Sequence, residues 1–353
     1  MTTYVPALDG TPEENAAELH RLLANPAGRL QLPEGRHVVA GGLVLTDGWT
    51  LAGIPGDGPA GAPRATLVQA APAEDPFVHV LGSRVGVEDV ALQVPAAHPG
   101  MHDGDRWTAV TVGRYLYRTD ATWLEGVAIR RVHVIRVGRC PANAVAVMGA
   151  VRDLHVADVR VQGGGTGLAV HWGAVGRDVS TLTGPSYHPH RLRLRDLTVT
   201  GAYEAFYLSS VHDVSVRGVR ANDVEIGFRL LPGDNTDRLH DDTGASPVSR
   251  GIEIRDCELG WSGRRYALRV AGWGRSEIDH RVTRLDYRDL TVDDIRIRPQ
   301  PVRDRNGHTD PRVAVVVENA GPVRFGRIRL GHSPGVQPAR VDGEYVPLSA
   351  LTR

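Results

Sequence analysis

Lysine is absent from this chain of 353 residues, so all 41 basic residues are arginines. The absence excludes a Schiff-base lysine, a lysine general base and the lysine of a phosphate-binding P-loop. Any cationic or proton-transfer role therefore falls to arginine, histidine or tyrosine. The 41 acidic residues balance the arginines. A formal net charge of zero gives no global field that would attract nucleic acid or an anionic membrane, and neither is an expected partner.

Cysteines, aromatic residues and long apolar runs are also scarce. The two cysteines, Cys140 and Cys257, are expected to be buried small hydrophobes, and their spacing predicts no zinc site. Aromatic residues make up 5% of the chain whereas Val and Gly abound, which disfavours a helix-rich fold. No stretch approaches about 18 apolar residues, and Met1 to Gly10 has neither region of a signal peptide. We expect a cytoplasmic protein if Met1 is the native start, and a secreted one if a leader was trimmed.

One octet, apolar-x-apolar-x-bend-apolar-x-apolar, recurs eight times. The copies are Val85–Leu92, Val127–Val134, Leu154–Val161, Leu192–Val199, Val214–Ala221, Ile252–Leu259, Leu285–Val292 and Val323–Leu330. Their bend residues, of types that tolerate a tight turn, are Asp89, Arg131, Asp158, Asp196, Gly218, Asp256, Asp289 and Arg327. Each octet thus predicts two short strands that meet at a corner. Their third positions should stack in one internal column, formed by Val87, Val156, Leu194, Val216, Ile254, Tyr287 and Phe325.

A third apolar stretch follows most octets. These stretches are Ala144–Met148, Gly167–Trp172, Ala205–Ser210, Gly227–Leu231, Ala267–Ala271 and Ala314–Val317. The octets start 22 to 42 residues apart, as in a solenoid whose coils carry loops of different length. Three strands per coil and no helical period predict an all-β parallel β-helix. We expect one domain over residues 1–353, with coils over 30–330 and a tail or cap over 331–353.

The N-terminus supplies one helix, over residues 11–25. Thr11 and Glu14 form a capping box, Pro12 takes the first helical position, and Asn25-Pro26 ends the apolar face. The helix is expected to cap the open end of the solenoid, where a first coil would otherwise expose its core and strand edges.

The start of the chain resembles that of pectate-lyase-superfamily proteins. The likeness lies in Asp9-Gly-Thr-Pro-Glu-Glu-Asn15, the short helix, Leu32-Pro-Glu-Gly35 and Leu51-Ala-Gly-Ile54, and the octets extend it over most of the chain. The resemblance implies a right-handed parallel β-helix that acts on or binds carbohydrate. We expect no cofactor. That superfamily includes lyases, hydrolases, transferases, epimerases and non-catalytic phage adhesins, so the fold leaves the reaction open.

The resemblance also implies that substrate lies along the outside of one sheet, here the sheet of the third stretches. Alternation points Leu168, Phe206, Phe228 and Leu268 inward, and places Tyr207, Arg229 and Arg269 in an outward ladder with His171 one coil away. These four side chains are the predicted catalytic row. Because an outward side chain should contribute little to the core, Arg229→Ala is expected to change stability by no more than about 1 kcal/mol. Outward arginines on the octets, such as Arg217, are expected to be a solvated face.

Long loops could wall a cleft over this row. The first contains Trp172 and ends at Tyr187-His-Pro-His190, so Trp172, His188 and His190 are candidate substrate contacts. The second carries Asp234, Asp237, His240, Asp241 and Asp242, where a solvated acidic loop is the simpler interpretation. Asn235-Thr-Asp237 resembles a motif of polygalacturonase-type hydrolases, in which the aspartate is catalytic. No metal site is predicted, and calcium held by these aspartates is the alternative, although their spacing is not that of an EF-hand.

Three functions stay open. In an enzyme acting on an acidic oligo- or polysaccharide, Arg229 and Arg269 would hold the uronate carboxylate while Tyr207 or His171 takes the adjacent proton, giving β-elimination or epimerisation. In an inverting hydrolase, Asp237 would pair with a second loop aspartate at about 6.5–9.5 Å. In a non-catalytic adhesin, the same side chains would only grip a polymer. Many such solenoids form homo-oligomers, and no interface is readable here.

Overall fold

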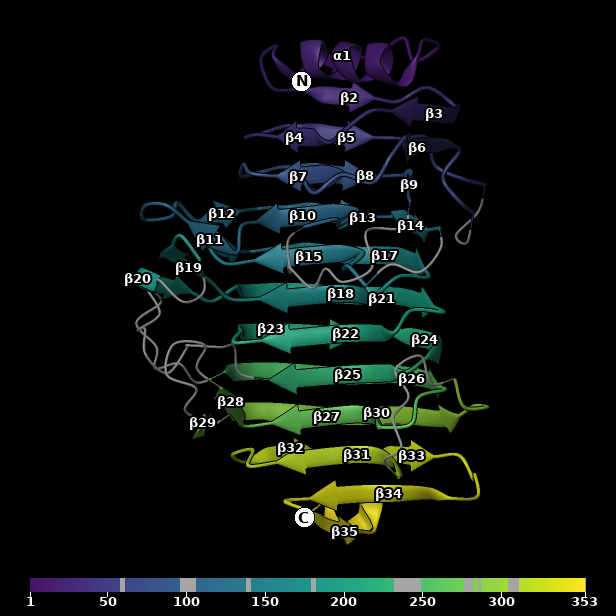
Figure 1. Ribbon diagram of the computed structural model, residues 1–353, viewed down its shortest axis with the longest axis vertical. Helices are drawn as coiled ribbons and strands as arrows, with labels where there is room; N and C mark the ends of the chain where they lie inside the picture. The colour runs from purple at the N-terminus through teal and green to yellow at the C-terminus, as the bar shows by residue number, and fades with distance from the viewer. Residues whose placement is uncertain are drawn as a thin grey trace.

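The computed structural model describes residues 1–57, 61–95, 106–137, 141–178, 182–231, 249–275, 282–284, 287–303 and 311–352. It is an elongated stack of parallel strands with the N-terminus at one end and the C-terminus at the other (Figure 1). A 19-stranded sheet contains both strands of each octet, and an 11-stranded sheet contains the third stretches. The expected all-β parallel β-helix with three strands per coil is confirmed. No helix among the described residues is long and apolar enough to cross a membrane.

The helix α1, Pro12–Leu23, covers the first coil (Figure 1). Thr11 is its N-cap: the Thr11 hydroxyl accepts from the Glu14 amide, and the Glu14 carboxylate accepts from the Thr11 amide. Leu19 and Leu22 are buried against the coils below, where α1 contacts β3 and β4. The predicted capping helix is therefore present, and it ends before Asn25.

The octet sheet is built from short strands in the first coils and long ones further on. Its strands are β1 Thr3–Tyr4, β2 Arg29–Gln31, β3 Gly35–Val39, β5 Thr50–Ala52, β6 Ala65–Gln69, β8 Gly86–Glu88, β9 Val90–Val94, β12 Leu124–Glu125, β13 Ala128–Arg130, β14 His133–Arg136, β16 Val151–Arg152, β17 His155–Gln162, β21 His190–Thr200, β23 His212–Arg217, β24 Arg220–Val224, β26 Arg250–Trp261, β30 Arg288–Pro299, β32 Val323–Phe325 and β33 Ile328–Leu330.

The 11-stranded sheet, called the front sheet below, faces the viewer in Figure 1. Its strands are β4 Leu43–Leu45, β7 Val78–Val80, β10 Val110–Gly113, β15 Val145–Met148, β18 Thr166–His171, β22 Glu204–Ser209, β25 Ile226–Leu231, β27 Tyr266–Ala271, β31 Arg312–Glu318, β34 Val336–Val341 and β35 Glu344–Val346. At the C-terminal end β35 returns antiparallel to β34, and a 3-10 helix, Leu348–Ala350, follows.

Two small sheets project where the front strands end. One joins β11 Leu116–Tyr117 to the hairpin of β19 Gly173–Gly176 and β20 Leu182–Tyr187. The other is the hairpin of β28 Trp273–Arg275 and β29 Val282–Arg284. Both lie at the left edge of the stack in Figure 1.

Left-handed backbone makes the octet corners. The bend residues Asp89, Arg131, Asp158, Asp196 and Asp256 have φ between 52° and 55°, and Gly218 has φ 73°. Most non-glycine side chains disfavour this region, and Asp is one of the few that tolerate it. The bends predicted at these six positions are confirmed. Arg327, in the last octet, is not among the residues with positive φ.

A second left-handed residue precedes most octets, and it explains one wrong prediction. Asp153, Arg191, Asp213 and Gly251 stand directly before their octets with φ between 51° and 62°. Asp289 (φ 54°) belongs to this set, and the bend of its coil is Asp294 (φ 50°). The seventh octet is therefore 290–297, since Ile252 pairs with Leu290 and Ile254 with Val292. Asp is favoured both directly before an octet and at the bend within it, so the sequence alone leaves the start of this octet uncertain by five residues.

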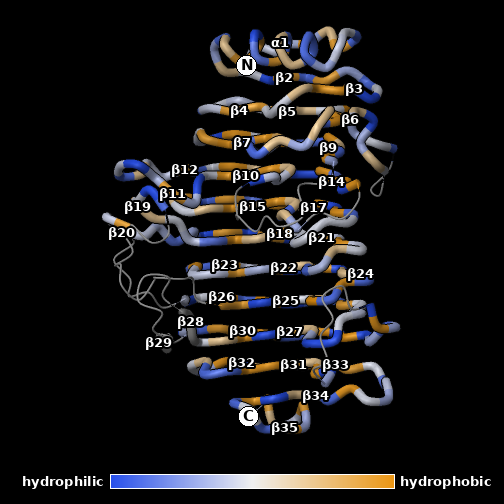
Figure 2. Tube along the Cα trace, in the orientation of Figure 1, coloured by the Kyte–Doolittle hydropathy of each residue, from blue (hydrophilic) through white to orange (hydrophobic). Residues whose placement is uncertain are grey.

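The internal column is otherwise as predicted. Register joins Val87, Ile129, Val156, Leu194, Val216, Ile254, Val292 and Phe325 in order. Val292 takes the place predicted for Tyr287, which is buried elsewhere and donates its hydroxyl to the Ala271 carbonyl at 3.0 Å. One hydrophobic cluster runs from Leu8 to Leu351, and apolar residues recur at each level of the stack (Figure 2).

Candidate functional site

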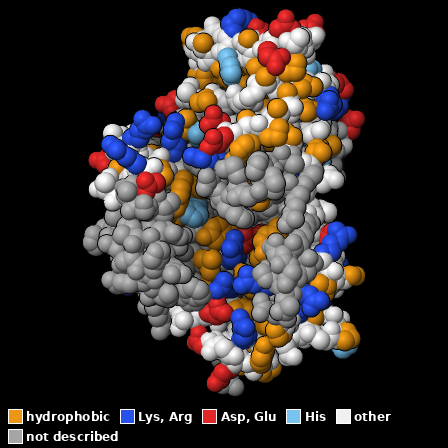
Figure 3. All heavy atoms as spheres, viewed as in Figure 1, with side chains coloured by type: hydrophobic (Ala, Val, Ile, Leu, Met, Phe, Trp, Pro, Cys, Tyr) orange, Lys and Arg blue, Asp and Glu red, His pale blue; other side chains and the backbone are white. Residues whose placement is uncertain are grey.

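The front sheet carries the predicted ladder. Backbone pairing places Ala169, Tyr207, Arg229, Arg269 and Val316 side by side on successive strands. The residues next to them in sequence, Phe206, Phe228 and Leu268 among them, are buried in the core. The ladder therefore faces outward, as the alternation predicted. In Figure 3 arginine side chains gather at this level of the front sheet.

The second residue of several of these strands is small and faces inward, so the residue before it also faces outward. Ala205 and Phe206 both belong to the core cluster, as do Ala267 and Leu268. Gly167 takes the same position on β18, where an added Cβ would come 2.7 Å from Val199 Cγ2. Because two successive residues face inward here, Glu204 and Tyr266 join the ladder on the outer face.

Arg229 is held by Glu204. Arg229 Nε and Nη2 each donate to a different Glu204 carboxylate oxygen at 2.7 Å, and Thr166 Oγ1 donates to Glu204 Oε2 at 3.1 Å. The Glu204 side chain has no exposed surface, whereas that of Arg229 is 31% exposed. Burial alone would lower the pKa of Arg229, but the adjacent Glu204 carboxylate outweighs it and the pKa is raised. The guanidinium also lies 4.5 Å from the centre of the Tyr207 ring.

Arg269 has a comparable partner in Glu318. Arg269 Nη2 donates to Glu318 Oε2 at 2.7 Å, and Arg340 Nη2 donates to Glu318 Oε1 at 3.0 Å. Register places Arg340 beside Val316, two strands beyond Arg269. Among the described residues, these three arginines thus share two glutamates. Arginine has five N–H donors, so Nη1 of Arg229 can still serve a ligand after the two bonds to Glu204.

His171 lies at the end of β18 beside the ladder. Its ring centre is 5.8 Å from that of Tyr207, 4.9 Å from that of Tyr115 and 5.6 Å from that of Trp172. Nδ1 is 3.0 Å from the Trp172 carbonyl, which can only accept, so Nδ1 carries the proton and Nε2 has a lone pair. The pKa of His171 is lowered to about 4, chiefly by burial and also by the charge of Arg229, although the bond to the Trp172 carbonyl acts in the opposite direction. The imidazole is neutral near pH 7.

Ser209 and Trp172 add polar atoms at the same end of the ladder. Both side chains are fully buried, and Ser209 Oγ and Trp172 Nε1 have no hydrogen-bond partner among the described residues. Since Val170 pairs with Leu208, Ser209 follows in the position beside His171. A buried polar atom without a partner costs free energy, and such atoms mark places where a ligand or water is bound.

The remaining candidate residues lie either around the corner from the ladder or outside the residues that the structure describes. His190 is 8% exposed, and His188 is fully buried with Nδ1 3.0 Å from His212 Nε2. Both follow β20, around the corner from the ladder. Asp234, Asp237, His240, Asp241 and Asp242 lie outside the described residues, so the hydrolase and calcium hypotheses stay predictions. No group of three His, Cys, Asp or Glu side chains suited to a metal occurs among the residues that the structure describes.

The sequence interpretation gave no role in the site to Glu204, Glu318 or Tyr115. Alternation alone placed Glu204 inward, because it does not show the extra inward residue at Ala205. The same alternation placed Arg229 outward and did not indicate a carboxylate partner for it. The contact with a fully buried carboxylate gives a physical reason to expect a larger cost for Arg229→Ala than the sequence predicted.

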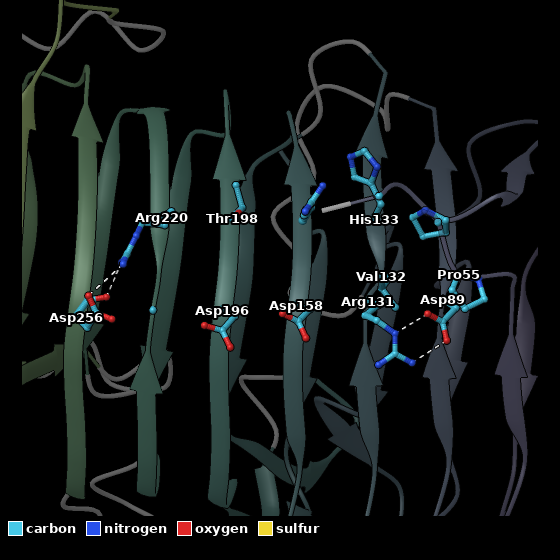
Figure 4. Close-up of a pocket in the computed structure, with 15 residues that line it drawn as sticks. Pro55, Asp89, Arg131, Val132, His133, Asp158, Asp196, Thr198, Arg220 and Asp256 are labelled. Atoms are coloured by element: carbon cyan, nitrogen blue, oxygen red, sulfur yellow. Dashed lines mark hydrogen bonds and ion pairs between the residues drawn. The ribbon is translucent and has the colours of Figure 1, made fainter. Parts of the chain in front are cut away.

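A charged groove follows the octet bends, away from the ladder. It encloses about 350 Å³ and is lined by bend residues of successive coils, among them Asp89, Asp158, Asp196 and Asp256 (Figure 4). Arg131 Nη2 donates to Asp89 at 2.8 Å and Arg220 Nη2 to Asp256 at 3.1 Å. Aspartates occur at these positions because the backbone there is left-handed, a conformation that Asp tolerates. We therefore assign this column to the fold and not to chemistry.

Neither a protein-family model nor a curated protein sequence matches the chain. Similar solved structures include the endo-xylogalacturonan hydrolase from Aspergillus tubingensis, at 11% identity and TM-score 0.54, covering 96% of this chain and 95% of the other. The tailspike protein of Escherichia coli bacteriophage HK620, solved with a pentasaccharide, is similar at 10% identity and TM-score 0.56. That match covers 96% of this chain and 62% of the tailspike chain. The chain has the right-handed parallel β-helix fold of the pectin-lyase-like proteins.

Proposed function

We propose that this protein is a carbohydrate-active enzyme that binds an acidic oligo- or polysaccharide across the front sheet. The observation that carries the proposal is the outward ladder of Tyr207, Arg229 and Arg269, with His171 beside it. Their positions on strands of a continuous sheet hold these groups in fixed geometry, as catalysis requires. The similar hydrolase and the tailspike solved with a pentasaccharide support a carbohydrate ligand.

The charge of the ladder favours an acidic sugar. The partly exposed Arg229 guanidinium can bind a uronate carboxylate while it keeps its two bonds to Glu204. Nη1 of Arg229 and the exposed part of the guanidinium are the donors for that carboxylate. As the proton on the adjacent carbon leaves, negative charge develops on the carboxylate, and this arrangement stabilises it.

His171 and Tyr207 supply the proton transfers in this proposal. Neutral His171 takes the proton through Nε2, and Tyr207 donates one to the leaving oxygen or to the opposite face of the carbon. The first route is β-elimination and the second epimerisation. Arg229, close to the Tyr207 ring, would stabilise a tyrosinate formed on the way.

Hydrolysis through Asp237 is the second candidate, because a similar fold belongs to a polysaccharide hydrolase. One assay separates the two. The protein is incubated with polyuronates, and near-ultraviolet absorbance and new reducing ends are recorded together. Elimination leaves an unsaturated uronate that absorbs, and Tyr207→Phe should suppress this signal more than Asp237→Asn. New reducing ends without absorbance, lost in Asp237→Asn, would establish the hydrolase instead.

A further inference from the structure

A second polar pocket lies around the corner from the ladder, where the octet strands begin. It encloses about 240 Å³, and its lining includes Trp123, His190, Arg191, His212 and Arg250. After Ser209 the chain turns through Ser210 and Val211 and reaches His212, so this pocket and the front sheet are on different sides of one corner. The proposed reaction uses none of these residues.

Coil stacking builds one wall of the pocket. Register places Arg152, His190, His212, Arg250 and Arg288 next to one another on successive coils. A left-handed residue follows each member, namely Asp153, Arg191, Asp213, Gly251 and Asp289. Because the chain repeats the same turn at each level, the basic side chains form a column. Neighbouring coils of a parallel sheet are about 4.8 Å apart, close enough for adjacent members to contact one ligand.

An aromatic ring forms another wall. Trp123 is held by the small sheet of β11, β19 and β20, with its ring centre 5.9 Å from that of Tyr187 and 4.7 Å from that of His190. The Arg152 guanidinium lies 6.0 Å from the Trp123 ring centre. Tyr187 accepts a hydrogen bond from the Ala121 amide at 2.9 Å, which fixes the segment before Trp123. A held indole ring beside polar groups is a suitable surface for the apolar face of a sugar ring.

The other arginines that line the pocket pair with nearby carboxylates, and Arg250 remains to bind a ligand. Arg152 pairs with Glu125 at 2.9 Å, and Arg191 pairs with Asp153 at 2.6 Å. His212 is held through Nε2 by His188, whose other ring nitrogen is 3.3 Å from Ser186 Oγ. No ion pair or side-chain hydrogen bond is found for the half-buried Arg250 within the described part of the chain. A partly desolvated guanidinium without a counter-ion favours binding of an anion.

We propose that this pocket binds one uronic acid residue, with the sugar ring on Trp123 and the carboxylate on Arg250. The volume suits a single ring, since it falls below the roughly 300–1,000 Å³ of sites for larger ligands. Asp213 also lines the pocket, where its carboxylate accepts bonds from sugar hydroxyls and disfavours a doubly charged phosphate. The site is separate from the ladder, and its occupancy does not require the ladder to be catalytic.

Ligand-observed NMR with monosaccharides tests the proposal on the full chain. The probes are glucuronate and galacturonate, and glucose and galactose are their neutral counterparts. We expect the acids to bind at least tenfold more tightly than the neutral sugars. Arg250→Gln should abolish this preference. Arg288→Gln is the matched control, because Arg288 occupies the same column one coil further on and does not line the pocket. It should keep the preference.

Three further outcomes test where the acid binds and which chemistry the pocket recognises. Trp123→Ala should weaken binding of the acids, and unchanged binding in both Trp123→Ala and Arg250→Gln would place the acid outside this pocket and overturn the proposal. Equal binding of acid and neutral sugar, or no binding, would also overturn it. If inorganic phosphate displaces the acids and Trp123→Phe changes nothing, the pocket is a general anion site and the proposal fails. Thermal melting of each variant shows that it is folded.

Discussion

Arg229 and Glu204 form a two-point ion pair in which the carboxylate is completely buried and the guanidinium is partly exposed. Both residues lie on the outer face of the front sheet, where Glu204 is covered. Glu204 is satisfied only while Arg229 and Thr166 remain in place, and Arg229 is oriented toward the Tyr207 ring by the two bonds to Glu204. A residue chosen for a role in binding is therefore also a structural residue.

The first prediction concerns the stability cost of breaking this pair. Arg229→Ala leaves a buried carboxylate without its counter-charge and should lower the free energy of unfolding by about 3–5 kcal/mol. The double variant Arg229→Met/Glu204→Gln removes both charges and should lose much less. Urea denaturation of Arg229→Met, Glu204→Gln and the double variant measures the coupling. The control is Arg217→Ala, an exposed arginine on β23, which should change stability by no more than about 0.5 kcal/mol. A small effect of Arg229→Ala would show that water replaces the guanidinium.

The ladder also shows what the sequence could and could not predict. The alternation of apolar residues around Phe206 and Phe228 is enough to place Tyr207 and Arg229 outward, because side-chain direction in a strand has a period of two. The partner of Arg229 could not be found in this way. Its position depends on an extra inward residue at Ala205, a local irregularity that leaves no mark in the hydrophobic pattern.

The predicted start of the seventh octet was wrong for a related reason. Asp289 and Asp294 both adopt left-handed backbone, and the sequence pattern has no means of telling the residue before an octet from the residue within it. Tyr287 was mistaken for a member of the internal column since it is apolar and stands two residues before an aspartate. Pairing with the preceding coil resolves the ambiguity. This pairing is a tertiary contact, which the local sequence pattern does not contain.

A second prediction tests the corrected corner. Asp294 has φ 50°, a region that a β-branched side chain strongly disfavours, so Asp294→Val should destabilise the protein by about 1–2 kcal/mol. Asp294→Gly should be tolerated better, because glycine adopts this region without strain. Arg296→Val on the same strand is the control, as an exposed strand position accepts a β-branched residue. Thermal melting compares the three. Equal effects of the two valine substitutions would mean that the chain does not bend at Asp294.

A third prediction concerns Ser209. Its hydroxyl is buried without a partner among the described residues, so Ser209→Ala should leave stability unchanged or raise it by up to about 1 kcal/mol. If the hydroxyl binds substrate, the same change raises KM severalfold while kcat changes little. Ser215→Ala, on the octet sheet, provides the comparison. Steady-state kinetics together with melting separate the two effects. A loss of stability without any change in KM would assign the Ser209 hydroxyl to the fold.

The last prediction follows from the neutral imidazole of His171. Burial lowers its pKa to about 4, so the Nε2 lone pair is available above that pH and is lost as the pH falls through it. If His171 is the base, kcat/KM for an acidic substrate should fall on the acid side with an apparent pKa near 4, well below the ordinary value of about 6.5. The same shift affects stability. Because the unfolded state takes up a proton that the folded state resists, the contribution of His171 is present above about pH 6.5 and is lost as the pH falls toward 4. His171→Gln should remove this part of the pH dependence of unfolding and suppress turnover. An acid limb near pH 6.5 in the wild-type protein, or one near 4 that persists in His171→Gln, would exclude His171 as the base.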